Sequence, residues 1–416
     1  MKKMRCFCLF LFAVLLPPAS AGAFDFSLIT NQYAGYYNQT GGENIFEYRG
    51  NLAPRIYDLI GDTGEYIITA NLSFGAKDEF FFVPELLRTE INFRFGGRLG
   101  ERLGERHSSS VIRAGRINYT DPLGFIAGGL FDGVQFSHNS SAGIFRVGAW
   151  YTGFLYKETA KITMTDNDRN NYEAELDYGD IVNTYFAPAR LLTSLDWEHS
   201  SIAGLFSFKA ALTGQFDFTD ADEKLHSQYL TVKASIPIKR FLLEIGGSLE
   251  LMQTAADSNF TMAYAGDFGV YWTLPLSFHS RLSFTGHIAG GRADDFIAAF
   301  VPVTTKTYGG VFQPKLSALS ILTLNYTARL NPAIGVGLSA SCLVRNDLET
   351  YTDYPVSEDG EGRILGTEIL ANIVWSPASD LQFNIGGGAF LPALGDAGPK
   401  EQTLWRAEIT VTFSIY

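Results

Sequence analysis

The sequence has few of the features that mark helical membrane proteins or disulfide-rich domains. Only three of its 416 residues are cysteines, and no apolar run is long enough for a membrane-spanning helix. Mean hydropathy is only +0.04. No helical block, linker or low-complexity tract interrupts the chain after its amino-terminal segment. These absences exclude a bundle of transmembrane helices and favour one domain of strands.

The amino-terminal segment has the pattern of a secretory signal. Lys2, Lys3 and Arg5 precede an apolar run over 6–16, and small residues follow at 19–21. We expect a signal peptide over 1–21, cleavage near 21–23, and one domain over 22–416. Removal of the signal peptide leaves Cys342 as the single cysteine, which excludes an intramolecular disulfide.

The charge balance is acidic, with 32 Lys and Arg against 44 Asp and Glu and a formal net charge of −12. Loss of the leader cations makes the remaining chain more acidic still. An acidic protein repels the phosphate backbone, so the composition argues against nucleic acid as a partner.

Signals for catalysis and metal binding are weak. The six histidines do not occur in the Ser/His or Asp/His pattern of outer-membrane hydrolases. The stretch 166–171 resembles the start of a calcium loop, but the downstream Gly and bidentate Glu are missing. We interpret it as a solvated acidic loop, and we expect no enzyme, no cofactor and no metal.

The strongest pattern in the sequence is an alternation of apolar and polar residues. Over 206–218, one face carries Phe, Phe, Ala, Leu, Gly, Phe and Phe, and the other carries Ser, Lys, Ala, Thr, Gln and Asp. A period of two indicates a strand, because successive side chains point to opposite faces. No helical layer is visible to cover the apolar faces. A closed sheet with lipid outside and water inside is the simplest solution.

The same pattern predicts a transmembrane antiparallel β-barrel of about eighteen strands, an even number typical of bacterial barrels. Merging or splitting segments near 45–60 or 132–139 would give sixteen. The expected strands are 24–37, 45–60, 65–76, 86–96, 110–119, 132–139, 143–156, 189–198, 203–218, 227–237, 240–253, 259–274, 280–292, 311–330, 333–345, 363–375, 380–391 and 403–416.

Connection lengths alternate, as expected for periplasmic turns and external loops. Short connections include 61–64, 139–141, 199–201 and 331–332, whereas 97–107 is longer than a periplasmic turn should be. The long connections, several of them acidic, are 157–187, 217–226, 294–310, 347–362 and 391–402, and we expect them to face outward.

Charges on the inward faces are candidate pore-lining residues, because an arginine facing the bilayer midplane would cost about 2–4 kcal/mol. Arginines dominate the first half of the chain, and carboxylates become frequent later. This order gives either opposed walls with a transverse field across the pore or simple pairing between neighbouring strands. The candidates are Arg88, Glu90, Arg94, Arg116, Arg146, Arg190, Asp196, Lys209, Lys233, Glu244 and Glu250.

The connection over 121–133 is apolar, unlike the acidic connections elsewhere. Such a loop should not lie in water, so it either folds into the barrel as a constriction or belongs to the external aromatic girdle. The candidate residues are Asp121, Pro122, Phe125, Phe131 and Asp132.

The architecture resembles bacterial outer-membrane porins over the whole chain after the leader. The apolar loop is similar in position to the third loop of general porins, which narrows their pore. Phe413 and Ile415 in the last strand resemble the carboxyl-terminal assembly strand of outer-membrane proteins, although the final aromatic residue, Tyr416, is out of phase with them. The resemblance implies outer-membrane lipid and the barrel-assembly machinery as partners.

We therefore expect a porin-like channel in the bacterial outer membrane for passive diffusion of small hydrophilic solutes. One alternative is a transporter of hydrophobic substrates similar to the fatty-acid transporters, with Trp150, Phe154, Leu242, Leu370 and Phe390 lining an apolar path. Another is a non-conducting surface protein that presents the acidic loop 157–187 to a partner. The solute, the ion selectivity and a homo-oligomeric state stay open.

Overall fold

The computed structural model describes residues 25–38, 42–77, 79–96, 108–221, 224–254, 260–276, 278–293, 296–348, 362–397 and 402–415. The signal peptide expected over 1–21, the connection 97–107 and the terminal Tyr416 lie outside the described residues.

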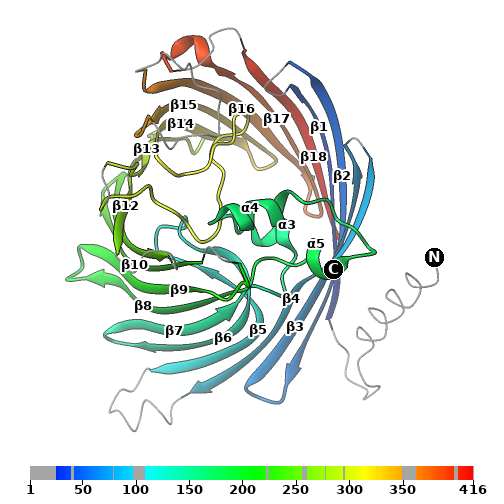
Figure 1. The fold of residues 1–416 in the computed structure, drawn as a ribbon, viewed down its shortest axis with the longest axis vertical. Coiled ribbons are helices and arrows are strands. Elements are labelled where there is room, and N and C mark those ends of the chain that lie inside the picture. The colour runs from blue at the N-terminus through cyan, green and yellow to red at the C-terminus, as the bar shows by residue number, and fades with distance from the viewer. Residues whose placement is uncertain are drawn as a thin grey trace.

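Eighteen antiparallel strands form one closed sheet (Figure 1). Each strand pairs with its neighbour in sequence, and β1 pairs with β18 from Leu28 opposite Ile415 to Tyr37 opposite Arg406. The strands are β1 (Asp25–Asn38), β2 (Asn44–Ile60), β3 (Gly64–Ala76), β4 (Phe80–Gly96), β5 (Ser109–Thr120), β6 (Gly128–Ser140), β7 (Gly143–Tyr151), β8 (Arg190–Ile202), β9 (Phe206–Asp217), β10 (Leu225–Ile238), β11 (Phe241–Thr254), β12 (Thr261–Thr273), β13 (Arg281–Ala289), β14 (Leu319–Asn331), β15 (Ile334–Arg345), β16 (Ile364–Ala378), β17 (Leu381–Leu391) and β18 (Leu404–Ile415).

The alternation in the sequence places apolar side chains on the outer face of the barrel and polar side chains on its inner face. In β9, Leu212 is 54% exposed on the outer face, whereas its neighbours Ala211 and Thr213 are buried on the inner face. Apolar side chains are exposed in the same way on the outer faces of the other strands. A continuous apolar surface of this kind is stable in contact with lipid and not with water.

No helix in the described part of the chain is long and apolar enough to cross a membrane.

The prediction of a closed eighteen-stranded barrel is confirmed, with differences at strand ends. β14 begins at Leu319 and not at residue 311, because Gln313 and Ala318 have positive φ angles of 54° and 49° and interrupt extended backbone. β7 ends at Tyr151, before the expected 156, whereas β4 begins at Phe80 and β6 at Gly128, earlier than expected.

Two long connections fold inward, which corrects the prediction that they face outward. The segment between β7 and β8 contains α3 (Lys157–Ala160), α4 (Asp166–Glu173) and α5 (Ile181–Thr184), and α3 and α4 lie within the ring of strands (Figure 1). The segment between β13 and β14 also enters the lumen, where Phe300 and Val303 are completely buried. A short helix η1 (Pro392–Leu394) follows β17. We call the end of the barrel with the long connections the loop end, and the opposite end the turn end.

The lipid-facing assignment of β9 predicts the effect of a single charge. Leu212→Arg should destabilise the folded protein in a bilayer by about 2–4 kcal/mol, because Leu212 lies near the middle of its strand on the outer face. Urea titrations of the protein in phospholipid vesicles measure this change. The folded fraction at each urea concentration is read from the different gel mobilities of the folded and unfolded protein in unheated samples. Lys209→Arg on the inner face of the same strand is the control and should have no effect. Equal stability of both variants would contradict the assignment.

Candidate functional site

Three inward-folded segments cross the lumen at the loop end and bind one another. They are the β5–β6 connection 121–127, the β7–β8 segment 152–189 and the described part of the β13–β14 segment, 290–293 and 296–318. Val303 N donates to Ile126 O at 2.7 Å, and Thr305 N donates to Lys161 O at 2.8 Å. These bonds join the segments into one layer, which we call the lumen layer.

The connection 121–127 is organised around one carboxylate. The two oxygens of Asp121 accept hydrogen bonds from the backbone N–H groups of four residues at 2.9–3.1 Å: Leu123, Gly124, Ile126 and Ala127. Burial raises the pKa of the Asp121 carboxyl, and the four N–H donors act in the opposite direction. The carboxylate therefore satisfies the backbone of a tight apolar turn far from bulk water.

The apolar side chains of this connection reach the opposite wall. The Phe125 ring lies 6.1 Å from the Phe300 ring and 6.3 Å from the ring of His287 on β13. Leu123 packs on Gly246 of β11, where an added Cβ would lie 2.3 Å from Leu123 Cδ2 and would displace that side chain. Phe125 and Phe131 are buried and Pro122 is half-buried. The structure thus places Asp121, Pro122 and Phe125 of the candidate constriction loop inside the barrel. Phe131 and Asp132 lie in β6 instead, where Asp132 pairs with Arg116.

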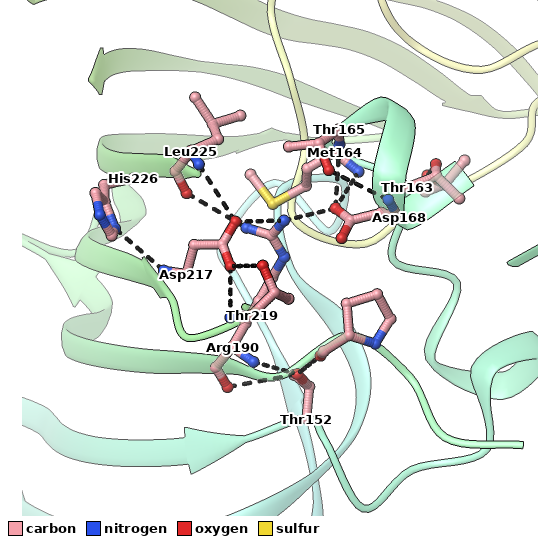
Figure 2. A network of polar contacts seen from close by, with 12 residues as sticks. Thr152, Thr163, Met164, Thr165, Asp168, Arg190, Asp217, Thr219, Leu225 and His226 are labelled. Carbon is pink, nitrogen blue, oxygen red and sulfur yellow. Dashed lines mark hydrogen bonds and ion pairs between the residues drawn. The ribbon is translucent and has the colours of Figure 1, made fainter. Parts of the chain in front are cut away.

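Arg190 anchors the segment 152–189 to the barrel wall (Figure 2). Its guanidinium lies 2.5 Å from the Asp168 carboxylate in α4 and 3.0 Å from the Asp217 carboxylate at the end of β9. All three side chains are almost fully shielded from solvent. Asp168 also forms a capping box with Thr165 at the start of α4. Asp168 is therefore not part of a solvated acidic loop, as the sequence suggested, but half of a buried ion pair.

A buried lysine holds the same segment together. Lys157 Nζ in α3 donates to Asn171 O at 2.9 Å and to Ala174 O. Burial lowers the pKa of its ammonium group, and Glu158 acts in the opposite direction. Two carbonyls thus replace the water that a surface lysine would bind.

The inward charges form ion pairs, which favours neighbour pairing over separate walls of opposite charge. Arg88 lies 2.6 Å from Glu90, and Arg146 lies 3.0 Å from Glu198. Arg190, predicted for the positive wall, is enclosed by two carboxylates and does not line the pore. The further pairs are Arg94–Glu65 (3.2 Å), Arg113–Glu90 (3.8 Å), Lys209–Glu198 (3.4 Å), Lys233–Glu244 (3.4 Å) and Lys233–Asp267 (3.1 Å).

Three other candidates for the pore lining are buried in the wall or beneath the lumen layer. Glu250 is fully buried and accepts from Val301 N at 2.9 Å. Asp196 is 7% exposed and accepts from Tyr119 Oη at 3.2 Å. Arg116 is also 7% exposed, so little of these three side chains is open to the lumen.

Three arginines of β2, β4 and β5 form asymmetric ion pairs, with the cation toward the lumen and the carboxylate behind it. The Arg49 side chain is 56% exposed and its partner Glu47 only 4%. Arg88 and Arg113 are 36% and 32% exposed, and the Glu90 that both contact is 1% exposed. A solute in this part of the lumen meets guanidinium groups, although the whole protein is acidic.

Two polar hollows flank the lumen layer, with volumes of about 440 and 420 Å³. The first lies between the connection 121–124 and strands β5 to β9, and the second lies where β18, β1 and β2 face residues 311–313. Charged side chains that line them are Arg113, Arg146, Asp196, Glu198 and Lys209 in the first and Glu47, Arg49 and Arg406 in the second.

Sequence reasoning missed several of these residues. Glu47 and Arg49 alternate on an expected strand, so their inward position could have been found from the period of two. The capping box of Thr165 and Asp168 was also readable from the sequence. In the described part of the chain, no group of three or more His, Cys, Asp or Glu side chains could hold a metal ion.

Comparison with solved structures identifies the fold. The chain is similar to the Pseudomonas aeruginosa outer membrane protein OprD, at 14% identity and a TM-score of 0.54, over 94% of this chain and 93% of that one. It is also similar to OccK5 (OpdH) and to OccK2 (OpdF) in complex with glucuronate, both from the same organism, at 12% identity. Their TM-scores are 0.57 and 0.59, and both comparisons cover 94% of this chain and 98% of the other.

No family model matches the sequence, and no curated protein matches it. The protein therefore has the fold of these solved structures, and identities of 11–14% extend the likeness no further.

The Arg190 network predicts unequal effects of two neighbouring carboxylates. Asp168→Ala leaves Arg190 paired with Asp217, but it removes one charged partner of that arginine and the capping box of α4. It should therefore destabilise the protein by about 1–3 kcal/mol and expose 157–187 to protease. Asp166→Ala removes an 81%-exposed partner of Arg169 and should cost about 0–1 kcal/mol. Urea unfolding and limited proteolysis measure both effects. Equal protease resistance of the two variants would show that Arg190 does not anchor the segment.

The Asp121 turn makes a second prediction. Asp121→Asn loses one acceptor oxygen and places an amide N–H₂ against backbone donors, which should cost about 1–3 kcal/mol for each unsatisfied group. The loosened turn should increase open-channel current noise in planar bilayers. Asp62→Asn, in an exposed turn at the other end of the barrel, is the control. Unchanged noise and stability in Asp121→Asn would argue against the role of this carboxylate.

Proposed function

We propose that the protein is an outer-membrane channel for passive diffusion of small hydrophilic solutes. The closed barrel with an apolar outer face and a polar lumen supports this proposal. Residues 1–21 would direct export as a signal peptide, and the last strand with Phe413, Ile415 and Tyr416 would be read by the barrel-assembly machinery.

The observation that carries the proposal is the asymmetry of the ion pairs along β2 to β5. Exposed guanidinium groups of Arg49, Arg88 and Arg113 line the lumen, and their carboxylate partners are buried behind them. Guanidinium groups bind carboxylates and phosphates in two-pronged geometry. We therefore propose that small organic anions pass most readily. The complex of the similar OccK2 with glucuronate is consistent with this solute class.

The arrangement does not favour an apolar path along the lumen or a free surface loop. Trp150 and Phe390, which would line an apolar path, are buried and not open to the lumen. Segment 152–189 is tied into the barrel through Asp168 and Lys157, so it does not form a free acidic loop for a surface partner. The contacts of the lumen support a channel and no catalytic role.

Ion selectivity tests the proposal. In planar bilayers under a salt gradient, the protein should show conductance steps and a reversal potential of anion selectivity. Arg49→Gln with Arg88→Gln should shift that potential toward cations, because Glu47 and Glu90 lose the charges that mask them. Arg329→Gln, at an exposed turn-end position, is the control and should leave it unchanged.

Liposome swelling with sugars and organic acids of graded size then defines the solute range. Absence of any conductance step from folded protein would refute the channel. Conductance steps whose reversal potential is unchanged by the double substitution would refute the solute path along β2 to β5.

A further inference from the structure

The barrel wall is interrupted between β4 and β5 on the side of the loop end. Their pairing runs from Gly96 opposite Ser109 to Thr89 opposite Arg116 and stops there. Residues 80–88 of β4 pair only with β3, and residues 117–120 of β5 pair only with β6. We call this open stretch the seam.

Local backbone features separate the strands at this point. The register between β3 and β4 shifts between Thr69 and Ala70, which leaves Leu87 as an extra residue in β4. A bulge of this kind bends its strand. Opposite it, Gly115 has a φ of +110° and lies so close to the Thr89 carbonyl that a side chain would not fit. The seam is thus built into the sequence by a bulge and a glycine.

Pro84 shows that the free edge of β4 is not designed to pair. In a strand, the N–H and C=O of one residue point to the same side. The Pro84 carbonyl accepts from Tyr185 and not from β3, so its nitrogen also faces the seam. Proline has no N–H, and in sheets it is confined to edges and bulges for that reason.

Side chains close the seam in place of a strand. The carbonyls of Phe82, Pro84 and Leu86, at alternate positions, accept hydrogen bonds from Tyr178, Tyr185 (2.9 Å) and Arg116 (2.5 Å). Tyr178 and Tyr185 belong to the inward segment 152–189. Both hydroxyls are donors at neutral pH, and burial raises the pKa of both phenols further above it.

Arg116 of β5 connects the two sides of the seam through hydrogen bonds. It forms a two-pronged pair with Asp132 at 2.7 and 2.8 Å, and it also donates to Phe154 O at 2.9 Å. One guanidinium therefore joins β4, β6 and segment 152–189. This position explains why Arg116 is buried and does not line the pore.

The part of the seam from residue 83 to residue 88 of β4 lies within the lipid-facing belt. The rings of Tyr48 and Phe74 lie 6.4 Å apart, and Phe82 is the register partner of Phe74, which marks an aromatic row toward the loop end. Ile91, Phe93 and Phe95 continue the apolar outer face of β4 toward the turn end. Aromatic rows of this kind mark the borders of the hydrocarbon region. Phe80 and Phe154 are exposed beside the seam, at 74% and 62%.

We propose that the seam is a lateral exit from the lumen to the outer leaflet for amphipathic solutes with one apolar chain. When Tyr178 and Tyr185 release β4, the lumen opens sideways, and the apolar chain leaves through the gap into lipid. The lumen water satisfies the freed carbonyls of β4, which hydrocarbon alone would not do.

The test locks the seam and compares two solutes with the same head group. In a Cys342→Ser background, Phe82→Cys with Tyr178→Cys is bridged by a short bifunctional thiol reagent. Cells that carry the protein take up a medium-chain or a short-chain monocarboxylate. The lock should reduce medium-chain uptake to the level of cells without the protein and leave short-chain uptake unchanged. The same double variant without reagent is the control.

A second variant releases the seam. Tyr178→Phe with Tyr185→Phe should raise medium-chain uptake by about tenfold, because two hydrogen bonds that hold the closed state are lost. Tyr172→Phe removes a hydroxyl from the same segment and should have no effect. The exit is overturned if the lock leaves medium-chain uptake intact, or if lock and release change both solutes in parallel. Loss of short-chain uptake in the unlocked protein would instead refute the channel itself.

Discussion

Closure of the sheet is the constraint on which the rest of the structure depends. In hydrocarbon, every backbone N–H and C=O needs a partner within the protein. The pairing of β1 with β18 joins the first and last strands of an eighteen-stranded sheet, so that neither is left as an edge. The alternation of apolar and polar residues then follows, because a closed sheet has one face toward lipid and one toward the lumen. The seam between β4 and β5 is tolerated because side chains supply the missing donors.

The lumen layer depends on buried polar groups that tie its segments to one another and to the barrel wall. Asp121 satisfies four backbone N–H groups, and Arg190 joins two carboxylates from different elements. Burying such groups is expensive unless they find partners. The bonding is not complete, because Arg190 Nε and Asp168 Oδ1 are buried with no hydrogen-bond partner among the described residues. The ion pairs and backbone bonds nevertheless hold irregular backbone inside the barrel and leave Arg49, Arg88 and Arg113 as exposed charges in the lumen.

The sequence predicts the barrel well because strand periodicity is local. The eighteen strands and the faces of β9 follow from residues adjacent in the chain. The inward course of 152–189 does not, because Asp168 is buried only by its pair with Arg190, and acidic residues otherwise predict solvent exposure. The period of two predicts that Arg190 and Arg116 face inward. It does not predict the carboxylates that pair with these arginines, because those carboxylates come from other strands and from α4.

The lumen layer also bears on the order of folding. Its bonds join residues far apart in sequence, with Thr163 and Thr305 separated by 142 positions and Gly128 and Thr304 by 176. Contacts of such high sequence separation form late, because the chain entropy of closing long loops must be lost first. The strands pair mainly with sequence neighbours, so the wall can assemble hairpin by hairpin. The width of the lumen is then determined at the end of folding, when the lumen layer forms. A slow final folding phase would report the docking of these segments and not the pairing of strands.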